Sequence, residues 1–145
     1  MQDYNKLAVW GKAHELVLEV YRTTARLPDR NYPGLVSQLR RASASIPANI
    51  VEGCAHASQG EFARFLQIAS ASALEVAYHL LLARDLGAMT TTQYARLEAR
   101  TLQVRQMLGG LLRRVRSDLA ADKPTPRVRV PPGVKPTAEN VQRKA

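Results

Sequence analysis

Apolar residues recur at intervals of three and four through most of the first 119 residues, and this spacing restricts the fold more than any other feature. Side chains three and four positions apart share one face of an α-helix, whereas a half-buried strand requires alternation. No segment of the chain combines alternation with β-branched residues. The sequence therefore predicts an all-α protein.

Proline, glycine and capping residues divide the periodic region into four predicted helices. The expected ranges are about 5–26, 35–53, 59–86 and 92–119. Pro28 and Pro33 separate the first two helices, because proline cannot continue a helix. Ser58 followed by Glu61 is typical of a capping box at the start of the third helix, and Gly87 suits the position just beyond its end.

Pro47 falls inside the second helix and frees the carbonyl of Ser43 from its usual partner. We expect a kink at this point. A break with Ser45 as a new N-cap is the alternative. The same helix is expected to end at Gly53.

One apolar face of each helix is expected to line the core. The four faces comprise Leu7, Trp10, His14, Val17, Tyr21 and Thr24; Leu35, Leu39, Ala42, Ile46 and Ile50; Phe62, Leu66, Ala69, Ala73, Val76 and Leu80; and Tyr94, Leu97, Thr101, Val104, Leu108, Leu111, Val115 and Leu119. On this interpretation His14 is a core histidine. Short connections between long helices favour antiparallel neighbours, so the expected architecture is an antiparallel up-and-down four-helix bundle.

The composition changes after Leu119. Residues 120–145 contain five prolines, six basic and two acidic residues, and only four larger aliphatic residues, all valine. Such a segment buries too little apolar surface to offset the entropy lost on ordering. We therefore expect a bundle domain over residues 1–119 and a flexible, disordered basic C-terminal tail over residues 120–145.

The third helix is apolar on more than its core face. The residues expected on its flanks and its opposite side are Ile68, Ala71, Leu74, Tyr78 and Leu82. A helix that is apolar around most of its circumference is usually buried on all sides. In a domain this small, the second face is expected to meet another subunit, which makes the protein a homo-oligomer. Tolerated exposure of the small residues on this helix is the alternative.

The chain has one cysteine, Cys54, which excludes a disulfide scaffold and a zinc ribbon. Its N-terminal region lacks the apolar core of a signal peptide, and no uninterrupted apolar stretch approaches the roughly 18 residues of a membrane span. These features predict a soluble cytoplasmic protein with no membrane partner. Cys54 has no sequence neighbour beyond His56 that could activate its thiol.

Groups for acid–base or metal chemistry are scarce. The three histidines are His14, His56 and His79. Glu75 and His79 share a helix face, but the di-metal sites of helical bundles need Glu and His three apart, and twice over. We therefore predict no metal, no cofactor, no catalytic residue and no enzymatic activity. An enzyme would have to use Glu52, Glu75 and His79.

Asn49 and Glu52 flank Pro47 and Gly53, where backbone groups are expected to lack their usual helical partners. Polar side chains at these positions can satisfy such groups. We therefore interpret Pro47, Asn49, Glu52, Gly53 and Glu75 as a structural motif, with ligand binding as the alternative.

Basic residues outnumber acidic ones by 21 to 12, and 16 of the basic residues are arginine. The planar guanidinium group suits contacts with phosphate. The candidate nucleic-acid-binding residues are Arg40, Arg41, Arg96, Arg100, Arg105, Arg113, Arg114 and Arg116. Aromatic residues for base stacking are few, so the expected contacts are with the RNA or DNA backbone. A solvated basic helix face without a ligand is the alternative.

The order of several motifs resembles that of one known family. These motifs are Leu7-x-Val9-Trp10, Leu27-Pro28, Tyr32-x-Gly34-Leu35, Gln38-Leu39-Arg40-Arg41-Ala42, Ser45-Ile46-Pro47-Ala48-Asn49-Ile50-Val51-Glu52-Gly53 and Glu61-Phe62-x-x-Phe65-Leu66, followed by Ser72 and Glu75. Over roughly residues 7–119, the chain resembles the four-helix-bundle proteins first noted as reading frames inside 23S ribosomal RNA intervening sequences. The family commonly has Arg near the position of His56, Lys near Gly60 and a second glutamate where this chain has Ala77.

This resemblance implies an up-and-down bundle that assembles into a ring, typically a pentamer. A related branch comprises accessory proteins of diversity-generating retroelements, which pair with a reverse transcriptase and its RNA. The first functional hypothesis is an oligomeric adaptor that binds nucleic acid, RNA in the first place, through arginine-rich helix faces. The second is an interaction scaffold or accessory subunit for a reverse transcriptase or another nucleic-acid enzyme. The third is a metal-dependent enzyme.

Overall fold

The computed structural model of the protein describes residues 1–27, 32 and 34–123. In this part of the chain a short 3-10 helix, η1 (Tyr4–Lys6), precedes four α-helices. The α-helices are α1 (Ala8–Thr24), α2 (Leu35–Ala55), α3 (Gln59–Asp85) and α4 (Thr91–Ala121). The prediction of an all-α chain with four long helices is confirmed.

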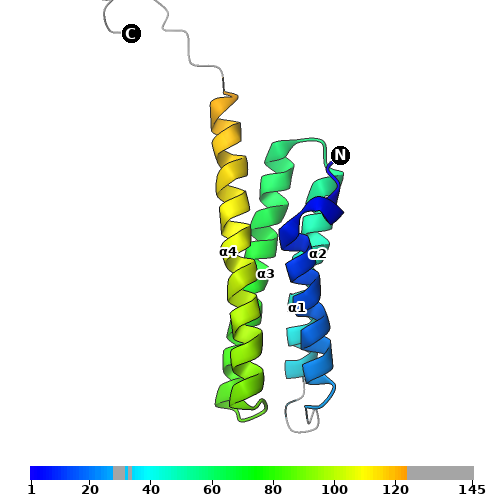
Figure 1. The fold of residues 1–145 in the computed structure, drawn as a ribbon, viewed down its shortest axis with the longest axis vertical. Helices are drawn as coiled ribbons and strands as arrows, with labels where there is room; N and C mark the ends of the chain where they lie inside the picture. The colour runs from blue at the N-terminus through cyan, green and yellow to red at the C-terminus, as the bar shows by residue number, and fades with distance from the viewer. Residues whose placement is uncertain (28–31, 33, 124–145) are drawn as a thin grey trace, which may run out of the picture.

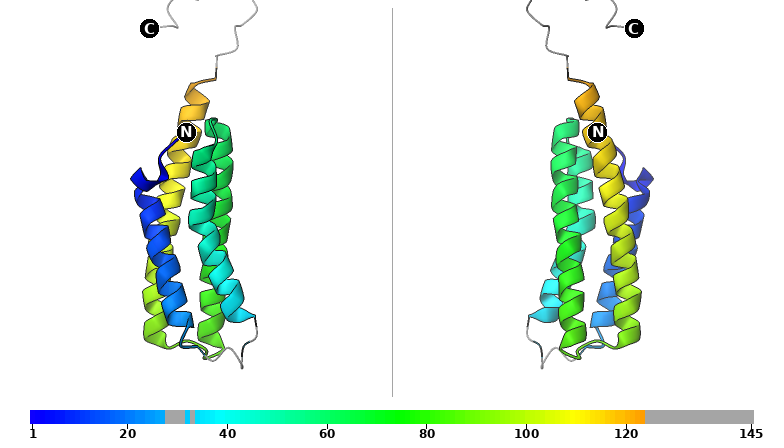
Figure 2. Two further views of the ribbon diagram at one scale, coloured as in Figure 1. Left: turned by 90° about the vertical axis from the view of Figure 1, so that its right-hand side faces the viewer. Right: turned by 90° about the vertical axis from the view of Figure 1, so that its left-hand side faces the viewer.

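The four helices lie side by side and run alternately up and down, as Figures 1 and 2 show. Each helix packs against its neighbour in sequence, and α4 closes the bundle by packing against α1. The last turns of α4 project beyond the loop between α2 and α3 (Figure 1). α4 runs two residues past the predicted domain boundary, and residues 124–145 of the predicted tail lie outside the described part of the chain.

The predicted core faces of α2 and α3 are confirmed at every position. On α4, five of the eight predicted positions are fully buried, and Tyr94, Leu111 and Leu119 pack against the core from partly buried positions. Leu112, which was not predicted, is buried next to them at 9% exposure. α4 therefore presents a slightly wider apolar face than a strict three–four spacing selects.

The predicted core face of α1 is confirmed only in part: Thr24 is buried and Leu7 and Trp10 pack against the core, but His14 and Tyr21 are exposed. The buried residues of this helix are Val9, Ala13, Leu16, Val20 and Thr24. His14 is exposed, and its ring stacks on Trp10 with the ring centroids 5.3 Å apart. The compact aliphatic stripe is buried, while Trp10 is partly buried and Tyr21 is 45% exposed. The predicted single helix over 5–26 is also interrupted at Leu7, whose extended backbone separates η1 from α1.

Capping groups set the ends of α3 and α4. Thr90 and Gln93 form a complete capping box at the start of α4. Ser58 caps α3 by accepting a hydrogen bond from the Glu61 backbone at 3.0 Å, but the Glu61 carboxylate pairs with Arg64, so only half of the predicted box forms. Gly87 adopts a positive φ of 70°, and its N–H bonds to the carbonyl of Arg84 as in a Schellman motif.

α2 continues through Pro47, so the alternative of a break with Ser45 as an N-cap is wrong. Ser45 lies inside the helix, where its hydroxyl is 2.9 Å from the hydroxyl of Ser72 on α3. Asn49 donates to both the carbonyl and the hydroxyl of Ser45, at 2.8 and 3.0 Å. These side-chain hydrogen bonds stabilise the helix near the proline. The kink remains a prediction.

The prediction that α2 ends at Gly53 is wrong, because the helix continues to Ala55. The role of Gly53 is to allow α2 and α3 to approach each other closely. A Cβ atom at position 53 would lie 2.9 Å from the Cβ of Phe65 and 3.0 Å from a ring carbon of Phe62. The Phe65 contact is with an atom fixed to the backbone, so a shift of one helix would be needed to relieve it.

Substituting Gly53→Ala is expected to lower the free energy of unfolding by about 1–3 kcal/mol, because overpacking of a close helix contact forces backbone shifts. The matched control is Gly11→Ala in α1, where an added Cβ meets nothing within 4 Å. This control should raise stability by about 0.5–1 kcal/mol, since alanine favours the helix. Urea unfolding followed by circular dichroism measures both changes, and equal effects of the two substitutions would contradict the proposed role of Gly53.

Candidate nucleic-acid interface

Arg40, one of the eight predicted nucleic-acid-binding residues, contacts other residues of the bundle. Its Nε donates to the hydroxyl of Thr24 at 2.8 Å, and its guanidinium group lies over the ring of Tyr21, 4.7 Å from the centroid. These contacts join α2 to α1. Arg40 therefore acts as a structural side chain, whereas its neighbour Arg41 is exposed.

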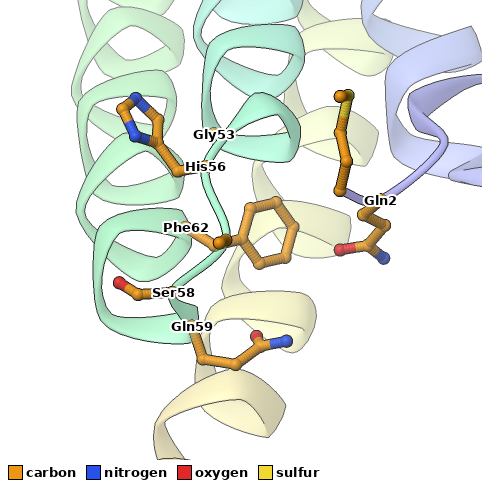
Figure 3. Close-up of a pocket in the computed structure, with 8 residues that line it drawn as sticks. Gln2, Gly53, His56, Ser58, Gln59 and Phe62 are labelled. Atoms are coloured by element: carbon orange, nitrogen blue, oxygen red, sulfur yellow. The ribbon is translucent and has the colours of Figure 1, made fainter.

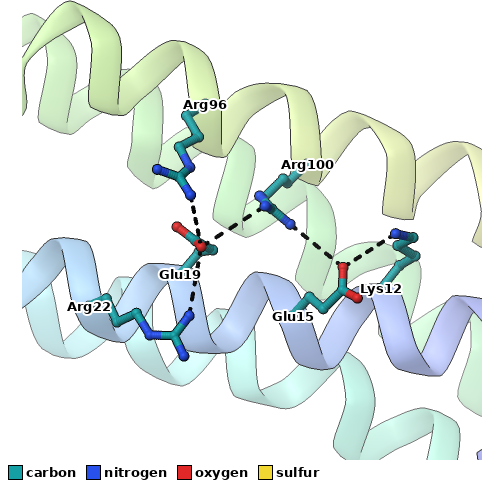
Figure 4. Close-up of polar contacts among 6 residues, drawn as sticks. All are labelled: Lys12, Glu15, Glu19, Arg22, Arg96 and Arg100. Carbon is teal, nitrogen blue, oxygen red and sulfur yellow. Dashed lines mark hydrogen bonds and ion pairs between the residues drawn. The ribbon is translucent and has the colours of Figure 1, made fainter.

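Arg96 and Arg100 are held by carboxylates of α1. Arg96 donates to Glu19 at 3.1 Å, and Arg100 lies 3.6 Å from Glu15 and 4.0 Å from Glu19. Figure 4 shows these residues together with Lys12 and Arg22, which also pair with the two glutamates. The side chain of Glu19 is only 14% exposed, so its charge is well screened from solvent by the arginines around it.

The other four arginines of α4 are Arg105, Arg113, Arg114 and Arg116, all of them exposed. No carboxylate among the described residues lies within 4.0 Å of any of them. Arg116 donates to the side-chain oxygen of Gln67 on α3 at 2.9 Å, which leaves its charge uncompensated. We call these four residues the arginine quartet. The predicted basic residues of α4 therefore fall into two groups: Arg96 and Arg100 pair with carboxylates of α1, whereas the arginine quartet has no carboxylate partner among the described residues.

The second apolar face of α3 is open in this single chain. Leu74 and Tyr78 are 54% and 60% exposed, Ile68 is 37% exposed, and Ala71 is exposed between them. Leu82, which was predicted on the same face, is partly buried and packs against the core. Two further apolar side chains escaped the sequence analysis: Leu81 on α3 and Leu102 on α4, at 37% and 47% exposure.

A shallow groove runs between α3 and α4 beside this open face. Leu74 and Leu102 form its apolar walls, and Arg105 lies at its edge. α3 is also long and apolar enough to span a membrane by length and composition. The same properties are typical of a core helix in a soluble protein, and α3 packs against both α2 and α4.

The remaining candidate residues do not come together as a catalytic site. Glu75 and His79 lie 3.4 Å apart on α3, while Glu52 is exposed near the end of α2. Among the residues that the structure places, no three His, Cys, Asp or Glu side chains are arranged to hold a metal ion. Asn49 has the structural role described above, and Ser72 is the partner of Ser45 across the helix contact, a pairing that sequence spacing does not predict.

A small open pocket lies where the N-terminus meets the loop between α2 and α3. Gln2, Gly53, His56, Ser58, Gln59 and Phe62 line it (Figure 3). The imidazole ring of His56 stacks on Phe65. Nearby, Cys54 is 2% exposed, and burial, with a smaller effect from Asp3, raises the pKa of its thiol. A raised pKa disfavours the reactive thiolate at neutral pH.

The geometry so far defines a small all-helical bundle with an apolar outer face and an uncompensated basic helix end. The 23S rRNA-intervening sequence protein family matches residues 5–110, and the chain belongs to this family. A crystal structure of a protein of unknown function from the S23 ribosomal protein family of Bacteroides thetaiotaomicron has the same fold, with a TM-score of 0.68 and 24% identity. The similarity covers 72% of this chain and 95% of that one. No curated protein sequence matches the chain.

The Glu19 carboxylate is expected to stabilise the contact between α1 and α4. Replacing Glu19→Gln leaves Arg22, Arg96 and Arg100 close together without their shared anion, and should lower the free energy of unfolding by about 1–2 kcal/mol. The control is Glu15→Gln. The side chain of Glu15 is 51% exposed, so this substitution should lower the free energy of unfolding by about 0.5 kcal/mol or less. Urea unfolding at low ionic strength measures both, and a larger cost for Glu15→Gln would contradict this assignment.

Proposed function

We propose that this chain is a non-enzymatic, oligomeric helical-bundle adaptor that binds the phosphate backbone of nucleic acid, RNA in the first place. The observation that carries the proposal is the arginine quartet on α4. Family membership supports it indirectly, since the family is named for intervening sequences of 23S rRNA. The name does not itself assign a binding activity.

The charge distribution supports backbone binding at the C-terminal half of α4. Arg105 and Arg116 are eleven residues apart, which corresponds to about 16 Å along a helix at 1.5 Å per residue. Over this length the quartet offers four guanidinium groups, and arginine can donate two parallel hydrogen bonds to one phosphate. Because no aromatic residue lies between them in the sequence, the contacts are expected to be with the backbone and weakly dependent on base sequence.

Assembly would multiply this charge. The open face around Leu74 and Tyr78 is apolar and lies on α3, across the groove from α4, which carries the quartet. Contiguous exposed apolar surface of this kind is typical of interaction sites. A ring of copies, which the family resemblance suggests is a pentamer, would present the quartet repeatedly and bind a polyanion more strongly than one copy could.

Replacing Arg113, Arg114 and Arg116 together with glutamine is expected to weaken RNA binding and its dependence on salt. Each lost phosphate contact on a single strand lowers the slope of log K against log salt by about 0.7, so the total decrease should be about 2. Filter binding of a single-stranded and a structured RNA between about 50 and 200 mM salt measures the slope.

The matched control removes the same charge elsewhere, through Lys12→Gln, Arg64→Gln and Arg84→Gln. Each of these residues pairs with a carboxylate in the structure. The control should leave the slope within experimental error of the unaltered protein. No RNA binding by the unaltered protein at the lowest salt would contradict the proposal, and would direct attention to a protein partner such as a reverse transcriptase.

Replacing Leu74→Lys and Tyr78→Lys is expected to dissociate the assembly without loss of helicity, because both side chains point away from the core. Light scattering coupled to size-exclusion chromatography should show a change from a multiple of 16.0 kDa to the single-chain mass. The control is Leu86→Lys, a leucine of similar exposure (46%) at the C-cap of α3. A single-chain mass for the unaltered protein across micromolar concentrations would contradict assembly.

A further inference from the structure

A second basic region lies at the opposite end of α4 from most of the quartet. An open hollow of about 690 Å³ lies between the end of α1 and the start of α4. Arg22, Arg26 and Arg96 line it, and Glu19 is the single carboxylate among the described residues of its lining. The formal charge of these lining side chains is therefore +2, which favours an anion as the occupant.

Hydrogen-bond donors outnumber acceptors around Glu19, which also favours an anion. Its carboxylate accepts from Arg96 at 3.1 Å and lies 3.7 Å from Arg22 and 4.0 Å from Arg100. Each guanidinium carries five N–H donors, whereas one carboxylate offers about four acceptor sites. Arg100 also reaches Glu15, but Arg22 and Arg96 pair only with Glu19 among the described residues. Both arginines keep donors available for a second anion.

The first turn of α4 contributes to the same hollow. The capping box satisfies the backbone N–H groups of Thr90 and Gln93, whereas those of Thr91 and Thr92 have no partner within the helix. Thr92 lines the hollow, and the positive end of the helix dipole lies there. At the end of α1, the carbonyls of Tyr21, Thr23 and Thr24 already accept hydrogen bonds from the following turn, which reduces their repulsion of an anion.

From this arrangement we infer that the hollow binds a phosphate monoester dianion, either free or at the end of a nucleic-acid strand. A dianion matches the local charge of +2, and arginine forks suit its oxygens better than they suit chloride. This inference is independent of backbone binding by the arginine quartet, because the two sites share no residue. Arg22 and Arg26 were not among the predicted contacts, and the site uses Arg96 together with the Glu19 network.

Isothermal titration with inorganic phosphate, at ionic strength matched with sodium chloride, tests the site. The variant Arg22→Gln with Arg96→Gln should weaken phosphate binding by about tenfold or more, since hydrogen bonds to charged groups are being removed. The control variant, Arg105→Gln with Arg113→Gln, removes the same charge from a different face of α4 and should bind phosphate within about twofold of the unaltered protein. Circular dichroism checks that both variants keep their helicity.

No detectable phosphate binding by the unaltered protein would overturn the inference, as would an equal loss in both variants. RNA oligonucleotides with a 5′-phosphate or a 5′-hydroxyl group then separate the two sources of the ligand. Tighter binding of the phosphorylated strand, lost in Arg22→Gln with Arg96→Gln, assigns the site to strand ends. Equal binding of the two strands, with inorganic phosphate still bound, assigns it to free phosphate. Loss of strand binding only in quartet variants concerns the proposed function and not this site.

Discussion

The close approach of α2 and α3 is the contact on which the rest of the bundle depends. At Gly53 the two helices are too close for a side chain to fit between them. The hydroxyl groups of Ser45 and Ser72 form a hydrogen bond across the same contact. Small residues on α3, such as Ala69 and Ala73, are completely buried. With one side of α3 held this tightly against α2 and another packed on α4, its third side remains outward. The exposure of the apolar residues on that side therefore follows from how the core is packed.

The electrostatics of the molecule follow from where its few carboxylates lie. Glu15 and Glu19 both lie on α1, facing the first half of α4, and there they neutralise Arg96 and Arg100. Among the residues that the structure describes, no such pair faces the second half of α4, so the arginine quartet keeps its charge there. A helix that is uniformly basic in sequence thus becomes two regions with different properties. The first region is a network with a small positive excess, and the second is a free basic surface.

The apolar face lies on α3 and the arginine quartet on the neighbouring α4, and this proximity links the two parts of the proposed function. Copies that meet through α3 would bring their α4 helices into one assembly and increase the charge available to a polyanion. A protein partner could instead use the apolar face. The family and the related bundle establish the fold, and the distribution of charge on α4 supports the choice of nucleic acid as the ligand.

The number and type of helices, and the buried faces of α2, α3 and most of α4, were determined by the sequence, because apolar spacing and end caps act within one helix. Tertiary structure alone decided the rest. α1 has two adjacent apolar stripes, and only the shape of the core selects Val9 and Leu16 over His14 and Tyr21. Gly53 was expected to end a helix and instead lets two helices touch. Which arginines remain free depends on carboxylates far away in the chain, and local spacing carries no information about such partners.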